Sequence, residues 1–196
     1  MAYSANRYLT RDEMEVNAHL IHTFFDGVGW TLNAIAAMLG NMESESTINP
    51  GIYENLDDTS TTNGFGLVQW TPNTKYKTWA DANGFEYGAI YGQLMKIWEE
   101  QENEDQWIPT TTHPLTFTEF SKSTESPETL AQAFLYNYER PADLNQPNRS
   151  TQARWWFTLL SGGTPDNPDT PVNPDIPTPT PTKMSKLLLY FAGTRR

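Results

Sequence analysis

Apolar side chains recur every three or four residues over most of the first 160 positions, the spacing of one face of an α-helix. The first such stripe runs from Thr10 to Asp26 and opens with a capping box, in which Glu13 follows Thr10 by three residues. A second helix follows Thr31 and should end between residues 42 and 46. Further helices are predicted at 72–83, 87–102, 118–122, 127–138 and 150–160. The pattern predicts a mainly helical domain.

One segment departs from the helical period. Residues 64–70, Gly-Phe-Gly-Leu-Val-Gln-Trp, follow a turn-rich stretch that begins at Asn49-Pro50-Gly51. A short apolar and aromatic run bounded by turn residues is typical of a strand. We therefore predict a short strand pair or hairpin arm here. Together with the helices, this predicts an α+β fold, a mostly helical domain with a small β-hairpin element.

The composition changes after Gly162-Gly163. Seven of the fourteen prolines lie between Pro165 and Pro181, in a stretch without aromatic residues. Such a segment cannot build a core and is typical of a semi-rigid polyproline-II spacer. We therefore divide the chain into a domain at 1–161, a Pro/Thr/Asp-rich linker at 162–183 and a short apolar-basic tail at 184–196. The tail is either a docking segment or the start of a second domain.

The charge distribution argues against some classes of function. Residues 1–161 carry nine Lys and Arg against 21 Asp and Glu, a net charge of −12. Phosphate backbones repel so acidic a surface, so we expect no nucleic-acid partner. The longest apolar run, residues 187–192, is too short to span a membrane. No basic segment precedes an apolar stretch at the N-terminus, and we therefore expect no signal peptide.

The chain lacks the residues or motifs that several other kinds of catalytic site require. The chain has no cysteine, which excludes thiolate nucleophiles and thiolate metal sites. His19 and His22 are the only closely spaced histidines, and no third ligand accompanies them, so no metal is expected. Neither a nucleophile-elbow motif nor a phosphate-binding glycine motif is present. We expect no cofactor.

The most informative residue is Glu45, which lies at the end of the second predicted helix, before Asn49-Pro50-Gly51. The negative end of the helix dipole and apolar neighbours such as Met42 and Ile48 would both favour the protonated carboxyl. A carboxylic acid that stays protonated near neutral pH can donate to a glycosidic oxygen. From this stretch alone, an ordinary solvated acid at a helix end is the favoured interpretation.

A second motif follows about twenty residues later. The segment Glu45-Ser46-Thr47-Ile48-Asn49-Pro50 is followed by Gly66-Leu67-Val68-Gln69-Trp70-Thr71-Pro72. This order and spacing resemble those of lytic transglycosylases and goose-type lysozymes. Taken whole, residues 1–161 resemble the phage tail lysozyme family, in particular the tail-knob peptidoglycan hydrolases of phi29-like phages, including the late segment Tyr138-Glu139-Arg140-Pro141. The resemblance implies a lysozyme-like fold and cleavage of peptidoglycan glycan strands.

The resemblance also implies roles for individual residues. Glu45 matches the catalytic glutamate of these families, and Glu43 is then expected to be a solvated surface acid. Gln69 matches the glutamine of the second motif, which is expected in the cleft wall. Val68 replaces a usual methionine, and Trp70 stands where an aliphatic residue is common. Trp70 is either a face for sugar stacking or a core residue.

A second carboxylate would distinguish a hydrolase from a transglycosylase, because a two-carboxylate hydrolase needs a base or nucleophile besides its acid. Glu54, Asp57 and Asp58 lie on the polar loop after Glu45. We favour Asp57, because its neighbour Leu56 could turn inward and hold it at the cleft rim. A solvated acidic loop is the alternative, and the choice between hydrolase and transglycosylase stays open.

A tyrosine from the helix at 127–138 is also expected in the site. Tyr138 shares an apolar stripe with Leu130 and Phe134, whereas Tyr136 faces solvent by the same periodicity. The superficial similarity of Leu135-Tyr136-Asn137 to a transglycosylase motif favours Tyr136 instead. We choose Tyr138 as a substrate-binding residue, with a core role as the alternative.

The resemblance implies a virion protein at the phage tail tip that opens the bacterial wall while the genome is delivered. Its partners would be peptidoglycan glycan strands and other phage tail proteins, the latter through the linker and the C-terminal segment. Two alternatives remain. The first is an enzyme that acts at host lysis, as an endolysin or transglycosylase, and the second is a tail structural or wall-binding module without catalysis.

Overall fold

The computed structural model describes residues 1–103 and 105–166. Residues Met1–Pro165 form one compact unit. Its α-helices are α1 (Arg11–Gly27), α2 (Leu32–Ser46), α3 (Thr74–Asn83), α4 (Ile90–Asn103), α5 (Phe117–Lys122), α6 (Pro127–Phe134) and α7 (Asn148–Leu160). A short 3-10 turn, η1 (Glu54–Leu56), and a π-helical turn, η2 (Leu135–Glu139), complete the elements. The predicted linker beyond residue 166 and the predicted tail at 184–196 lie outside the described residues.

Local signals determine where the helices begin. The Thr10 side chain accepts a hydrogen bond from the Glu13 amide and the Glu13 side chain accepts one from the Thr10 amide, which completes the predicted capping box of α1. The Thr31 hydroxyl caps α2 by accepting from the Ala34 amide. Ser126 caps α6, whose first residue is Pro127. These starts are therefore encoded within a few residues of each helix.

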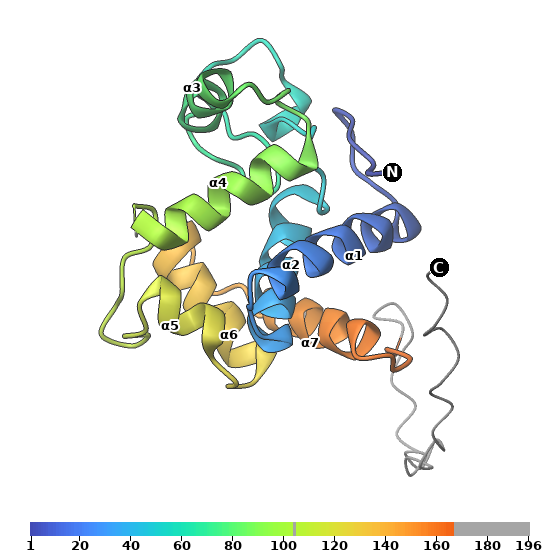
Figure 1. The fold of residues 1–196 in the computed structure, drawn as a ribbon, viewed down its shortest axis with the longest axis vertical. Coiled ribbons are helices and arrows are strands. Elements are labelled where there is room, and N and C mark those ends of the chain that lie inside the picture. The colour runs from blue at the N-terminus through green and yellow to red at the C-terminus, as the bar shows by residue number, and fades with distance from the viewer. Residues whose placement is uncertain (104, 167–196) are drawn as a thin grey trace, which may run out of the picture. The chain divides into compact units, whose positions relative to one another are not determined.

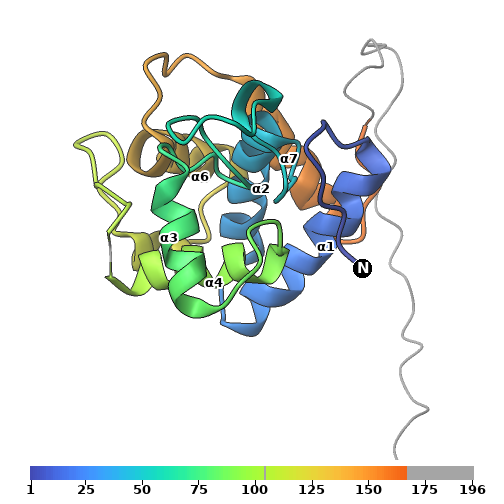
Figure 2. The ribbon, with the colours of Figure 1, turned by 90° about the horizontal axis from the view of Figure 1, so that it is seen from above.

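Helix α2 is the centre of the core. It lies between α1 and α7 on one side and α6 on the other, and it is central in both views (Figures 1 and 2). Every residue from Ala34 to Met42 is buried. Most of these side chains are Ala, Gly, Leu, Ile or Met, and they contact neighbouring helices on all sides, as expected for a helix without a solvent face.

The predicted β-hairpin is wrong, and with it the α+β class, because the described residues contain no strand. Only an isolated antiparallel bridge joins Tyr53 and Phe65. The chain turns at once, because Gly66 has a φ of +81° and the amides of Gln69 and Trp70 bond back to Gly66 and Phe65. The described domain is therefore helical.

A close approach between two helices holds α2 against α7. A Cβ atom on Gly40 would lie 2.5 Å from the Arg149 carbonyl oxygen and 2.6 Å from the Ala153 amide nitrogen. Both atoms belong to the backbone of α7, so no side-chain rearrangement could relieve the contact. Glycine at this position lets the first turn of α7 pack directly on α2, and it thereby determines where the Arg149 side chain begins.

We predict that Gly40→Ala destabilises the domain by about 3 kcal/mol, the upper end of the usual overpacking cost, because backbone atoms must move. Chemical denaturation monitored by circular dichroism would measure the change. Gly27→Ala at the end of α1 is the matched control, since a Cβ atom added there would have nothing within 4 Å. A Gly40→Ala protein as stable as wild type would contradict the direct packing of α7 on α2.

Candidate active site

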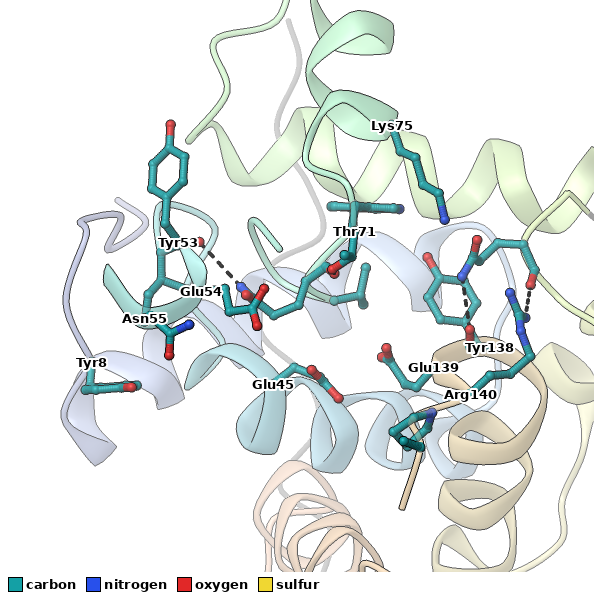
Figure 3. A pocket seen from close by; sticks show the side chains of 17 residues that line it. Tyr8, Glu45, Tyr53, Glu54, Asn55, Thr71, Lys75, Tyr138, Glu139 and Arg140 are labelled. Atoms are coloured by element: carbon teal, nitrogen blue, oxygen red, sulfur yellow. Dashed lines mark hydrogen bonds between the residues drawn. The ribbon is translucent and has the colours of Figure 1, made fainter. Parts of the chain in front are cut away.

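Glu45 lies in the last turn of α2, at a cleft of about 730 Å³ (Figure 3). The helix stops abruptly because Thr47 and Ile48 both have positive φ, 53° and 52°, which is rare for β-branched residues. The Glu45 side chain is 19% exposed. Its carboxylate is therefore accessible from the cleft while most of the side chain is covered by protein.

Arg149 at the start of α7 is the partner of Glu45. Its Nη2 lies 2.5 Å from Glu45 Oε1, while its Nη1 donates to Asn41 Oδ1 at 3.1 Å and its Nε to Gln146 Oε1 at 2.7 Å. The guanidinium side chain is only 5% exposed, so these contacts replace nearly all its water. The sequence did not single out Arg149, because no local pattern connects it with Glu45.

The two motifs of the sequence meet in the structure. The Ser46 hydroxyl donates to the carbonyls of Met42 and Leu67, each at 2.9 Å, and so joins the end of α2 to the second motif. From α4, the Gln93 side chain accepts from the Leu67 amide at 2.8 Å and donates to the Pro50 carbonyl at 2.7 Å. These hydrogen bonds hold the cleft wall at a defined position next to Glu45.

Gln69 is one of the residues that line the cleft. Its backbone has a φ of 48°, and its side-chain amide donates to the Gly66 carbonyl at 3.0 Å. Trp70 also borders the cleft but is 3% exposed, and one face of its ring stacks on Tyr76 with the centroids 4.9 Å apart. Trp70 is thus a core residue that reaches the cleft surface.

Tyr138 and Trp70 are held by the same buried carboxylate, Glu100 of α4. Trp70 Nε1 donates to Glu100 Oε1 at 3.0 Å, and the Tyr138 hydroxyl donates to Oε2 at 2.5 Å. Burial raises the pKa of Glu100, while these hydrogen bonds and the charge of Lys96 act in the opposite direction. Tyr138 is buried and borders the cleft, whereas Tyr136 borders a separate groove.

Of the three acidic residues on the loop after Glu45, only Glu54 lines the cleft. Asp57 is not among the cleft-lining residues, and its Oδ1 accepts hydrogen bonds from the amide and the hydroxyl of Thr59 at 3.0 and 2.6 Å. These bonds hold the pKa of Asp57 below its usual value. Glu54 does line the cleft, but its Oε2 accepts from the Gly64 amide at 2.8 Å. Asp58 is exposed.

Glu43 is not the solvated surface acid expected from the sequence. Its carboxylate accepts two hydrogen bonds from Arg11, at 2.7 and 3.0 Å, and one from Trp156 Nε1 at 2.7 Å. The side chain is 9% exposed. Glu43 therefore links α2 to α1 and α7, and it faces away from the cleft that Glu45 borders.

Glu139, at the end of η2, is a cleft residue that the sequence pattern did not select. The sequence offered only one signal for it, the segment Tyr138-Glu139-Arg140-Pro141 that forms part of the family resemblance. Its Oε1 is fully covered and has no hydrogen-bond partner among the described residues. Burial raises the pKa of Glu139 well above its usual range, and the negative charge of Glu45 raises it further. The charge of Arg149 partly opposes this shift.

Membrane spans and metal sites are both absent from residues 1–103 and 105–166. No helix in this part of the chain is both long and apolar enough to cross a membrane. The same residues contain no group of three or more His, Asp or Glu side chains placed to hold a metal ion.

Comparison with known proteins identifies the family. The family model for phage tail lysozyme matches residues 16–160, well over half of the chain. The chain belongs to the phage tail lysozyme family. It is also 54% identical over 162 residues to Morphogenesis protein 1 of Bacillus phage B103, a match that covers 83% of this chain and 44% of that protein. The chain thus spans less than half the length of this curated relative.

This result confirms the family predicted from the resemblance of residues 1–161 taken whole. As a member of this family, the protein is a phage lysozyme-like protein. Four of the five site residues proposed from the sequence line its cleft, namely Glu45, Gln69, Trp70 and Tyr138. Their place at the cleft does not establish their roles. Arg149 pairs with the first of them, and Glu139 is a further carboxyl group beside it.

We predict that Glu139→Gln raises the melting temperature, and that the gain grows as the pH rises above about 4.5, the ordinary pKa of the side chain. When folding raises the pKa of a carboxyl group, the free energy of unfolding falls as the pH rises through the folded-state pKa. Glutamine does not ionise, so the variant does not show this fall. The gain near pH 8 should be a few degrees, since about 1 kcal/mol moves the melting temperature of such a domain by roughly 2–4 °C.

Glu13→Gln is the control with the opposite sign for this measurement. The hydrogen bonds from Arg7 lower the pKa of Glu13 to about 2, so Glu13 stabilises the fold at neutral pH and loses this effect on acidification. Glu13→Gln should therefore melt below wild type near pH 7, and the gap should close as the pH falls. A pH-independent difference for Glu139→Gln would contradict the raised pKa.

Proposed function

We propose that the chain is a glycosidase that cleaves the glycan strands of peptidoglycan, with Glu45 as the general acid. The observation that supports this most directly is the position of Glu45 at a helix end, on a cleft of about 730 Å³, in a member of the phage tail lysozyme family. The cleft volume lies within the range of small-molecule sites and suits a few sugar units of a polymer.

The chemistry requires a proton donor at the glycosidic oxygen. Glu45 donates this proton, the bond between C1 and the oxygen breaks, and its electron pair stays on the leaving oxygen. In a hydrolase, water then adds to C1. In a transglycosylase, the C6 hydroxyl of the same sugar attacks C1 and closes a 1,6-anhydro ring. We propose hydrolysis as the outcome for this chain.

The cleft lining suits a substrate with many hydroxyl groups and some negative charge. Tyr8, Tyr53 and Asn55 offer polar groups at one end of the cleft (Figure 3), and Gln69 also lines it. The cations Lys75 and Arg140 also line the cleft, although the domain as a whole is strongly acidic. These positive groups can offset the repulsion between an acidic protein and the anionic bacterial wall.

We further propose that the protein acts as part of the virion, at the tail tip, and opens the wall locally while the phage genome is delivered. Similarity to a phage protein named for morphogenesis supports a virion-associated role. Delivery by the particle also suits an acidic enzyme, which would approach an anionic wall slowly by diffusion. In this proposal, the proline-rich segment tethers the domain to other tail proteins.

Glu45→Gln tests the proposed acid. The variant should fold normally and lose about 10²-fold or more of the activity on purified peptidoglycan, because glutamine cannot donate the proton. Zymography and turbidity assays would measure the loss. Substantial activity in a correctly folded Glu45→Gln protein would contradict the assignment.

Glu43→Gln is the neighbouring control for this experiment. It should melt at a lower temperature than wild type, because the paired hydrogen bonds from Arg11 and the bond from Trp156 depend on the carboxylate. Below its melting temperature it should keep its activity on peptidoglycan, because its carboxylate does not line the cleft.

The products distinguish hydrolysis from transglycosylation. We expect mass spectrometry of digested glycan strands to show reducing-end sugars that have gained one water for each bond cleaved. Products that consist mainly of 1,6-anhydro sugars would instead identify a transglycosylase, in which Glu45 alone acts first as acid and then as base. An absence of any cleavage by the wild-type chain would favour a binding or structural tail module.

A further inference from the structure

Besides Glu45 and Glu54, the cleft is lined by a third carboxyl group, that of Glu139, which the chemistry proposed for Glu45 alone does not use. The carboxyl groups of Glu45 and Glu139 are turned toward each other in Figure 3, one from α2 and the other from η2. Glu139 Oε1 is buried without a hydrogen-bond partner among the described residues. Leaving a buried carboxyl oxygen unsatisfied costs stability, which is most readily explained when the group has a task in the site.

The π-helical turn explains how Glu139 reaches this position. The Arg140 amide bonds to the Leu135 carbonyl at 2.8 Å, five residues back, and the Arg140 φ of 49° ends the turn. Such turns insert one extra residue into a helix and are frequent at functional sites. The extra residue changes the direction in which the side chains after Phe134 project.

Both neighbours of Glu139 are held by hydrogen bonds. Tyr138 is tied to Glu100, and its ring also stacks on Phe134 with the centroids 4.5 Å apart. The Arg140 guanidinium donates to the carbonyls of Gln106 and Asn137, at 2.5 and 2.6 Å. By contrast, Glu139 Oε1 has no hydrogen-bond partner among the described residues, and Glu139 lines the cleft. The turn is therefore rigid around a carboxyl group that is available for chemistry.

We propose that Glu139 is the second carboxylate of the site and shares a single proton with Glu45 during glycosidic cleavage. This inference rests on the proposed function and deepens it. It replaces Asp57 in that role, because Asp57 is bonded to Thr59 and does not line the cleft.

The charges around the pair support this arrangement. Two carboxylates close together cannot both ionise without a large electrostatic cost, so one retains a proton. The charges that act on Glu139 belong to Glu45 of α2, Arg149 of α7 and Glu100 of α4, with Arg140 beside it along the chain. Arg149 forms its ion pair with Glu45, which leaves the proton of the free protein on Glu139.

The shared proton gives a complete reaction cycle. Glu139 passes its proton to Glu45, and Glu45 delivers this same proton to the glycosidic oxygen, which keeps the electron pair of the broken bond to C1. Both carboxylates are then placed beside the positively charged sugar carbon, and the negative charge that has developed on the pair stabilises it. Water adds to C1 and releases a proton to Glu139. One water is consumed for each bond cleaved, and the pair regains its single proton.

The test compares Glu139→Gln with wild type in the full 196-residue chain, on soluble glycan strands prepared from peptidoglycan. We expect kcat to fall about 10²-fold or more while KM changes only a few-fold, because a proton-transfer group is lost. The alkaline limb of the pH–activity profile should also move to lower pH, since a single carboxyl cannot keep a proton as the pair does. Glu139→Asp should restore part of kcat and the wild-type alkaline limb.

Glu86→Gln, an exposed acid outside the cleft, is the matched control and should behave as wild type. A merely structural role of Glu139 would lower activity without moving the alkaline limb, and this outcome would overturn the proposal. Full activity of Glu139→Gln, or a loss in Asp57→Asn without one in Glu139→Gln, would overturn it as well.

A second readout does not depend on activity. In protein labelled with ¹³C at the glutamate carboxyl carbons, one resonance should vanish in Glu139→Gln, and in wild type this resonance should titrate well above the range of an ordinary glutamate. In Glu45→Gln, the same resonance should titrate at lower pH, because the neighbouring negative charge is gone. If this resonance titrates in Glu45→Gln as it does in wild type, the proposal that the two carboxyl groups share a proton is wrong. Wild-type protein that cleaves no glycan would overturn the proposed function, whereas an active wild type with an unaltered Glu139→Gln variant overturns the role of Glu139 alone.

Discussion

The close packing of α2 on α7 at Gly40 is the constraint on which the candidate active site depends. Only glycine leaves room for the α7 backbone at this point, and Arg149 begins from that contact. Because its guanidinium is almost fully buried, it needs partners that can replace water, and Glu45, Asn41 and Gln146 supply them. The position of the Glu45 carboxylate is therefore a consequence of how tightly two helices can approach.

Carboxyl groups gather at the cleft and in the buried core beside it, where an ionised carboxylate is unfavourable. Glu45, Glu139 and Glu100 lie near one another, and burial raises the pKa of the last two. The nearby arginine and lysine side chains offset only part of this cost. Perturbed groups of this kind gather at functional sites, where they hold protons that chemistry can use. The same arrangement is unfavourable for folding, and the well-packed helical core around α2 compensates for it.

The two sequence motifs contribute mainly by building the cleft wall. Ser46 joins the end of α2 to Leu67, and the Asn49 side chain donates to the carbonyls of Ala5 and Arg7 in the N-terminal segment. That segment carries Tyr8 to the end of the cleft. Of the residues in these motifs, Glu45 alone combines a carboxyl group with access to the cleft. The remaining motif side chains hold it and its surroundings in place.

Local signals in the sequence were enough to predict the helices, the family and the place of Glu45 at a helix end. Helix starts follow from caps such as Thr10 and Ser126, which act within three or four residues, and apolar periodicity marks which face is buried. The partners of these elements could not be predicted in this way. Residues 64–70 have a strand-like composition, but the Gln93 side chain takes the Leu67 amide and the segment turns instead.

The charged groups beside Glu45 likewise could not be predicted from local sequence signals. Asp57 was the acid favoured along the loop, whereas Glu139 and Arg149 are the charges that lie beside Glu45 in space, the latter 104 positions away along the chain. Apolar periodicity and capping depend on neighbours within a few residues, and the chain encodes them locally. Electrostatic interactions depend on distances between side chains that no local pattern encodes, so the tertiary structure alone decided which charged groups meet at the cleft.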